Sequence, residues 1–108
     1  MPTMKIAVTS QNRKTVTDHP GRCRKFWIYT IEDGQVASKR LLELSKAESF
    51  HDSDSHEPHP LDDIDVLITA STGRGLTRRL SRKEIQLQVS NESDPDTAVR
   101  QFLESGST

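Results

Sequence analysis

The side chains best able to do chemistry lie in one polar stretch of this sequence, which reads DHPGRC. It holds an imidazole, His19, and the only thiol of the chain, Cys23, four residues apart. Both groups can ligate soft metals or an iron–sulfur centre. The neighbouring cations Arg22, Arg24 and Lys25 predict a lowered thiol pKa and a thiolate at Cys23. The alternative, which residue types alone favour, is that Cys23 is a small apolar residue buried beneath the loop.

A second set of metal-ligand types is formed by His51, His56 and His59, which lie within an acidic stretch. Three imidazoles with neighbouring carboxylates could chelate a divalent metal, so these histidines are secondary candidates for metal binding. Their spacing matches no zinc-finger pattern, and structural zinc usually takes thiolates as well. A solvated polar loop is the favoured interpretation, and any metal bound there is expected to be weakly held.

A third candidate is the turn that reads TGRG, with Gly73, Arg74 and Gly75. Backbone N–H groups at the start of a helix, together with flexible glycines, can bind an anion. The pattern matches neither the dinucleotide fingerprint nor the P-loop. Glycines that serve only a tight turn and a helix start explain it equally well.

Charge is unevenly distributed, although the formal net charge is only −1. Residues 11–25 hold five basic side chains and one acid, and residues 74–83 hold five basic side chains and no acid. Residues 48–65 hold seven acids and neither lysine nor arginine. Such runs are usually solvated faces. An anionic ligand is predicted only if the fold brings the two basic segments together.

The expected elements alternate between short apolar runs and turns. Strands are predicted over residues 5–9, 26–31, 36–44, 66–70 and 86–89, with an Asp33-Gly34 hairpin turn between the second and third. Helices are predicted over 76–83 and from Pro95, where Asp94 is a good N-cap. In the first helix Leu76 and Leu80 share one face and the arginines occupy the other.

These elements predict one α/β domain over residues 1–108, with a flexible polar loop over 45–60 and a frayed tail over 105–108. The last strand–helix–strand unit implies parallel strands and a right-handed crossover. If strands 5–9 and 66–70 are adjacent and parallel, the loop 17–24 and the turn 73–75 meet at a topological switch point, where open α/β sheets bind ligands.

We expect a cytoplasmic protein with no membrane segment. The sequence has a single cysteine, no signal-peptide pattern at the N-terminus and no apolar run near ~20 residues.

Four stretches in this order resemble the dinitrogenase iron–molybdenum cofactor biosynthesis family: KIAVTS, HPGRCRKFWIYTIEDGQV, LDDIDVLITASTGRGLTRRL and DPDTAVRQFLESG. The resemblance implies a three-layer α/β/α fold of the ribonuclease H-like kind. Its mixed five-stranded sheet has the order 3-2-1-4-5, with strand 2 antiparallel to the rest. It also implies binding of an iron–sulfur or molybdenum–iron–sulfur cluster. By position, His19, Arg22 and Cys23 fall in the family's first-loop motif, and Gly73 and Gly75 in its turn after the fourth strand.

Two departures from the family shape the expected function. The helical segment before the fourth strand is shortened to the polar loop 45–60, and a single cysteine excludes a cluster held by several thiolates of one chain. We therefore expect a non-catalytic carrier of a pre-assembled cluster, acting as a monomer or homodimer with cluster donor or acceptor proteins. The alternatives are a cofactor-free regulatory or interaction module and, less favoured, a nuclease. Neither a nucleic acid nor a membrane is an expected partner.

Overall fold

The computed structural model describes residues 3–18, 23–45, 48–49, 59, 61–71 and 74–106. In chain order they form β1 (Thr3–Thr9), β2 (Lys25–Glu32), β3 (Gln35–Glu43), β4 (Val66–Thr69), α1 (Arg74–Arg82), β5 (Gln86–Val89) and α2 (Pro95–Gly106). The five strands form one sheet of order β3-β2-β1-β4-β5. Strand β2 is antiparallel to both of its neighbours, whereas β4 is parallel to β1 and to β5.

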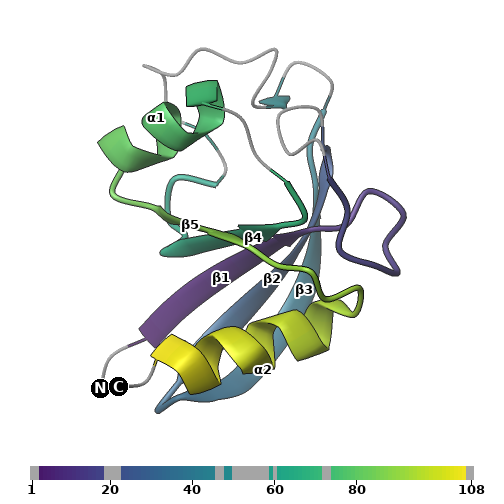
Figure 1. The fold of residues 1–108 in the computed structure, drawn as a ribbon, viewed down its shortest axis with the longest axis vertical. Coiled ribbons are helices and arrows are strands. Elements are labelled where there is room, and N and C mark those ends of the chain that lie inside the picture. The colour runs from purple at the N-terminus through teal and green to yellow at the C-terminus, as the bar shows by residue number, and fades with distance from the viewer. Residues whose placement is uncertain are drawn as a thin grey trace.

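The two helices cover opposite faces of the sheet, α1 above it and α2 below it in Figure 1. The three-layer architecture, the strand order and the orientation of β2 are therefore confirmed. Strand β4 explains why the layers form, because all four of its residues are buried. An uninterrupted apolar strand must be covered on both faces.

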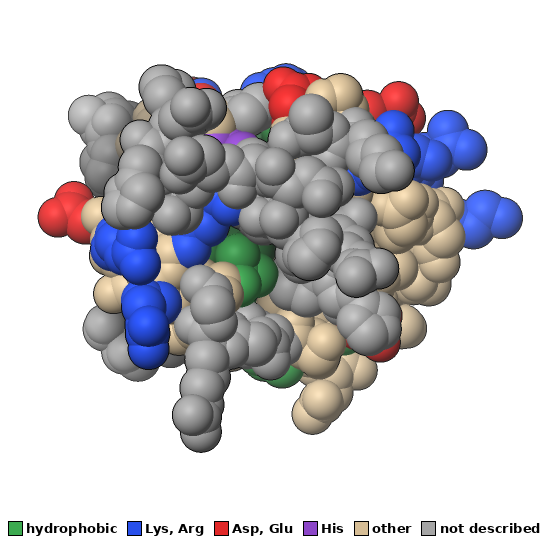
Figure 2. Space-filling view, turned by 90° about the horizontal axis from the view of Figure 1, so that it is seen from above, with side chains coloured by type: hydrophobic (Ala, Val, Ile, Leu, Met, Phe, Trp, Pro, Cys, Tyr) green, Lys and Arg blue, Asp and Glu red, His purple; other side chains and the backbone are tan. Residues whose placement is uncertain are grey.

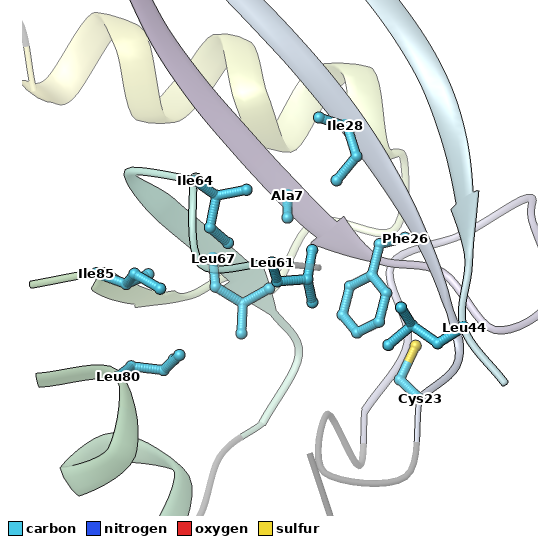
Figure 3. Close-up of a cluster of buried hydrophobic side chains, with 10 residues drawn as sticks. All are labelled: Ala7, Cys23, Phe26, Ile28, Leu44, Leu61, Ile64, Leu67, Leu80 and Ile85. Atoms are coloured by element: carbon cyan, nitrogen blue, oxygen red, sulfur yellow. The ribbon is translucent and has the colours of Figure 1, made fainter. Parts of the chain in front are cut away.

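Side chains alternate along the strands and supply two separate cores. On the α1 side, Ala7, Phe26, Ile28 and Leu67 pack with Leu80 (Figure 3). The α2 side holds a second cluster of buried residues, namely Ile6, Val8, Val16, Tyr29, Ile31, Val66, Ile68, Ala98 and Val99. This period of two places successive side chains of a strand on opposite faces, so the central strands contribute to both layers.

Local signals set the turns and the helix starts. Asp33 and Gly34 both have positive φ, 54° and 78°, as a two-residue type I′ hairpin turn requires. At the start of α2, the Asp94 carboxylate accepts the Thr97 N–H at 3.1 Å, which confirms the predicted N-cap. The observed bounds of most strands and of both helices differ from the predicted ranges by one or two residues.

Three expectations need correction. Ser49 and His59 are buried, so at these positions the segment 45–60 is packed against the domain and is not a solvated loop. Arg79 is buried beside Leu80, so the arginines of α1 do not all lie on an outer face. Helix α2 continues to Gly106, two residues into the stretch that was expected to fray. In the part of the chain that the structure describes, no helix has the length and apolar character to cross a membrane.

Candidate functional site

The carboxyl ends of β1 and β4 lie side by side at one edge of the sheet. The two strands pair in parallel, with Ile6 opposite Val66 and Val8 opposite Ile68. The connection that leaves β1 and the turn that leaves β4 therefore start next to each other (Figure 1). On either side of this pair the chain continues to opposite edges of the sheet, which makes the position a topological switch point.

Thr17 ties the first loop to both strand ends. Its N–H donates to the Thr9 carbonyl at 2.9 Å. Its carbonyl accepts the Thr9 hydroxyl at 2.7 Å, the Ala70 N–H at 3.2 Å and the Thr69 hydroxyl at 3.3 Å. The first part of the loop thus continues the sheet edge and is held against β4.

The tip of the same loop is closed by polar side chains. The Asn12 carboxamide oxygen accepts the N–H groups of Lys14 and Thr15, both at 2.9 Å, and the Ser10 hydroxyl donates to the Thr15 carbonyl at 2.8 Å. Val16 is buried, and its N–H donates to the Ser93 carbonyl at 2.8 Å. Residues 10–17 are consequently well anchored.

Cys23 lies at the same edge, with its side chain turned into the α1-side core near Phe26 and Leu44 (Figure 3). The residue is only 2% exposed, and its Sγ donates to the Lys25 carbonyl at 3.0 Å. Burial raises the pKa of the thiol above its ordinary value, although hydrogen-bonding groups of Lys25, Ser10 and Thr17 act in the opposite direction. The prediction that nearby cations lower this pKa is therefore wrong, because desolvation is the dominant effect. In this conformation Cys23 is a protonated, buried thiol.

Basic side chains surround the edge. Arg13, Lys14 and Arg24 are exposed. Arg24 is held in place, because its N–H donates to the Gln11 side-chain oxygen at 2.8 Å and its Nε donates to the Leu44 carbonyl at 3.1 Å. Local positive charge of this kind favours an anionic ligand.

Helix α1 carries the second basic segment. It starts at Arg74 and includes Gly75 in its first turn, and Arg78 and Arg82 are exposed along it. Figure 2, which views the molecule from the α1 side, shows Lys and Arg side chains at the end of this face where α1 lies and also at the opposite edge. The predicted residues His19, Arg22 and Gly73, and the side chain of Arg74, lie outside the described part of the structure. Their convergence with Cys23 stays a prediction.

His59 lies elsewhere, near the end of α1, and both of its ring nitrogens bind backbone groups. Nδ1 accepts the Leu61 N–H at 3.0 Å, and Nε2 is hydrogen-bonded to the Glu48 carbonyl. Burial lowers the pKa of this imidazole, and the positive charges of Arg79 and Lys83 add to the effect. A metal at His59 would have to displace one of these hydrogen bonds. His51 and His56 lie outside the described residues. Within the described ranges, no group of three or more His, Cys, Asp and Glu side chains is placed to hold a metal ion.

Thr9, Ser10, Thr17 and Thr69 are structural parts of this edge that the sequence analysis did not single out. Both buried strands end in the same way, with threonine followed within two residues by serine, in AVTS and in LITAS. This repeat was the available signal, since hydroxyl groups at the ends of two adjacent parallel strands can bind the loops that follow them.

Comparison with known families identifies the chain at this point. The model of the family described as "Dinitrogenase iron-molybdenum cofactor" matches residues 2–105. The chain belongs to this family. The match includes the loop after β1, the turn after β4 and all seven elements of the fold.

Individual relatives cover most of this chain. An uncharacterized protein of Methanocaldococcus jannaschii is 26% identical over 103 residues, which cover 94% of this chain and 86% of the relative. A crystal structure of another protein of that organism, provisionally assigned as a dinitrogenase, has a TM-score of 0.72 at 20% identity and covers 97% of this chain and 92% of its own. An NMR structure from Thermotoga, provisionally assigned as a NifB protein, has a TM-score of 0.66 at 20% identity, with coverages of 94% and 88%. At these identities the two solved structures support the fold.

Proposed function

We propose that this chain binds and carries an iron–sulfur or molybdenum–iron–sulfur cluster at the carboxyl ends of β1 and β4, without catalysing a reaction. The observation that carries the proposal is membership of the iron–molybdenum cofactor family together with a basic loop at the switch point of the sheet. The switch point is where α/β sheets bind ligands, and the exposed cations around it suit an anionic cargo.

The proposed ligands are the imidazole of His19 and the thiol of Cys23. Arg22 and Arg74 would balance negative charge, and backbone N–H groups at Gly73 and Gly75 would donate to cluster sulfur or oxygen atoms. Metal ligation requires a thiolate. Loading therefore requires Cys23 to lose its proton and its 3.0 Å hydrogen bond to Lys25, so the loop must move when the cluster binds.

A single thiol favours carriage over assembly. Clusters are usually built on several cysteines, and this chain has one. One thiolate and one imidazole suit a pre-assembled cluster that another protein has delivered, held by one chain or shared between two copies of it.

The positions of the acids argue against a nuclease. Two-metal phosphodiester cleavage needs carboxylates gathered around one site. Strand β1 contains no acid, and Asp65 precedes β4, where its carboxylate accepts the Lys5 N–H at 2.8 Å. Asp63 pairs with the Lys5 ammonium at 2.9 Å. These carboxylates lie at the amino ends of the strands, opposite the basic loop.

A cofactor-free interaction module is the second candidate. The observation that favours it is the state of Cys23, which is buried, hydrogen-bonded and protonated. In this alternative the thiol serves the core, and the basic edge binds an acidic surface of a partner protein.

Anaerobic reconstitution distinguishes the two candidates. The purified chain is incubated with iron, sulfide and molybdate, or with a cluster donor, and bound metal and charge-transfer absorption are measured. We expect stoichiometric metal in the wild type and loss of most of it in Cys23→Ala and in His19→Ala. His51→Ala is the matched histidine control and should load normally. Equal loading of all four proteins would show that the proposed ligands are wrong, and no metal in any of them would favour the cofactor-free module.

A further inference from the structure

Strand β3 is an open edge of the sheet. It ends the strand order β3-β2-β1-β4-β5, and among the described residues no further strand pairs with its outer side (Figure 1). The strand at the opposite edge, β5, has four residues, whereas β3 has nine, most of them exposed. A very short edge strand is protected from pairing with another chain, and a long exposed one is not. Strand β3 is therefore the edge at which the sheet can be extended.

A bulge near the hairpin limits the regular part of this edge. The register between β2 and β3 shifts at Thr30 and Ile31, so that Ala37 has no partner residue on β2. Such a bulge bends the strand and interrupts its pairing. The regular edge consequently consists of residues 38–43.

The hydrogen-bonding pattern shows which backbone groups of this edge face outward. The Leu44 N–H donates to the Arg24 carbonyl at 2.7 Å, and hydrogen-bonded positions recur at every second residue of an antiparallel ladder. Arg40 and Leu42 therefore turn their N–H and C=O groups toward β2. The alternate residues of the edge turn these groups away from the sheet, namely Lys39, Leu41 and Glu43.

The same three residues share one face of the sheet, because side chains alternate along a strand. This is the face that α2 covers, since the Lys39 Nζ lies 2.8 Å from the Asp96 carboxylate and 4.4 Å from the centre of the Trp27 ring. The Lys39 charge is thus held over the sheet and does not block the edge. Along this face the edge reads positive, apolar and negative, at Lys39, Leu41 and Glu43.

A second copy that lies antiparallel to β3 complements this order when the two-fold axis passes beside Leu41. Leu41 then lies opposite Leu41 of the other copy, and Lys39 lies opposite Glu43 on both sides of the axis. Opposite charges at directly facing positions of neighbouring strands stabilise the pairing. The three pairs of outward residues would exchange about six main-chain hydrogen bonds. The surface is therefore self-complementary, as a two-fold interface requires.

Other two-fold registers that pair the outward backbone groups lack this complementarity. A centre at Lys39, Arg40 or Glu43 places like charges directly opposite each other, which is destabilising. A centre at Leu42 brings no opposite charges together, and centres nearer the hairpin run into the bulge. The charges of β3 therefore select the register about Leu41.

We infer that β3 is a self-association surface, through which two copies of this chain pair antiparallel and form one continuous sheet. The basic loop lies beyond the end of β3, where the Arg24 carbonyl accepts the Leu44 N–H. Antiparallel pairing points the basic loops of the two copies in opposite directions. Each copy then holds its own cargo, a consequence that rests on the proposed function, whereas the association itself is a property of the empty protein.

The first test is analytical ultracentrifugation of the metal-free chain. We expect the wild type to pass from monomer to dimer between about 1 μM and about 1 mM, the range of small interfaces. Lys39→Glu and Glu43→Lys should each weaken dimerisation about 30-fold, because two attractive cross-strand pairs become repulsive. Glu32→Lys, an exposed acid at the end of β2, is the matched control and should dimerise like the wild type.

Mixing the two charge variants gives the sharpest result. In the mixed pair every acid at one of the two positions faces a lysine of the other copy, so Lys39→Glu and Glu43→Lys should form a heterodimer although each alone is monomeric. Loss of folding cannot produce this recovery. A mixture that associates no more than its separate components would overturn the inference.

Hydrogen exchange at low and high protein concentration tests the register without any substitution. The amides of Arg40 and Leu42 should be protected at both concentrations, because they are bonded to β2. The amides of Lys39, Leu41 and Glu43 should become protected only at the concentration at which the dimer forms. A dimer in which these three amides exchange freely would place the interface elsewhere and overturn the inference.

The result for the wild type is scored separately from cluster loading. A chain that stays monomeric up to about 1 mM, with the three outward amides exchanging freely, would also overturn the inference and leave this edge to an extended segment of a different protein. If the dimer forms and takes up no metal in the anaerobic reconstitution, the proposed function fails and the self-association stands. If the chain loads metal as a monomer, the self-association fails and the proposed function stands.

Discussion

Cys23 and His59 are both metal-ligand types, both are almost fully buried, and both are hydrogen-bonded to backbone carbonyls. They differ in where they lie and in which of their atoms are hydrogen-bonded to the backbone. Cys23 lies at the edge where two loops meet, and its sulfur donates a hydrogen bond to the Lys25 carbonyl. His59 lies near the end of α1, and both of its ring nitrogens bind the backbone.

The surroundings of His59 show what such a residue does instead of binding metal. Its N–H donates to the Asp62 carboxylate at 2.8 Å, and its carbonyl accepts the Asp62 N–H at 2.9 Å. Asp62 also pairs with Lys83, just after α1. His59 therefore connects Glu48, the turn before β4 and the end of α1. The comparison teaches that position in the fold separates the two residues: Cys23 lies at the edge where the loops after β1 and β4 start, whereas the ring of His59 joins backbone groups away from that edge.

Truncation of the two side chains should give the largest contrast. His59→Ala removes two ring hydrogen bonds, leaves buried backbone groups without partners and opens a cavity, so we expect about 3 kcal/mol less stability. Cys23→Ala removes one small side chain, and about 1 kcal/mol is expected. Urea denaturation of both variants measures the difference. His59→Gln, which keeps a donor and an acceptor, should recover part of the loss. Equal destabilisation by the two alanine variants would show that His59 contributes no more to stability than Cys23 does.

Acid should weaken the fold through His59. Its pKa is lowered in the folded state, so the folded protein favours the neutral ring. The stabilisation is complete above the unfolded pKa of about 6.5 and is lost as pH falls from there through the lower folded value. The urea midpoint of the wild type should therefore fall between pH 7.5 and pH 5, and that of His59→Gln should fall less. If the urea midpoints of the two proteins fell by the same amount, His59 would not be the source of the acid-dependent loss of stability.

Alkali should have the opposite and smallest effect, through Cys23. Burial raises the pKa of this thiol in the folded state, so the folded protein favours the protonated form. The stabilisation is complete below the unfolded pKa of about 8.5 and is lost as pH rises through the folded value. The urea midpoint should therefore decline above pH 8.5 in the wild type, and Cys23→Ala should lack this part of the decline. Cluster loading, which needs the thiolate, should become faster over the same range.

Most of the fold could be predicted because each element carries its own local signal. The run VLIT specifies a buried strand, Asp33-Gly34 a two-residue turn and Asp94-Pro95 a helix start. These signals act over a few residues. The strand order came from the family resemblance, since pairing of β1 with β4 joins residues about sixty positions apart.

The errors share one physical cause. Arg79 and Ser49 were expected to face solvent, and the pKa of the Cys23 thiol was expected to fall, because their sequence neighbours are polar or charged, whereas the favoured expectation that Cys23 is buried is confirmed. In the structure all three are buried, and burial reverses the expected pKa shift of the thiol. Desolvation depends on what packs against a group in three dimensions, and sequence neighbours do not determine it.

The sequence by itself determined the secondary-structure elements, the single thiol, the two basic segments and membership of the iron–molybdenum cofactor family. Tertiary structure alone decided that Thr17 joins the ends of β1 and β4 and that both ring nitrogens of His59 are hydrogen-bonded to backbone groups. It also decided that the Cys23 thiol is buried and that its pKa is raised. The physical reason is the distance along the chain over which each effect acts. Propensity and periodicity act between near neighbours, whereas hydrogen-bond partners and burial depend on chain segments that only folding brings together.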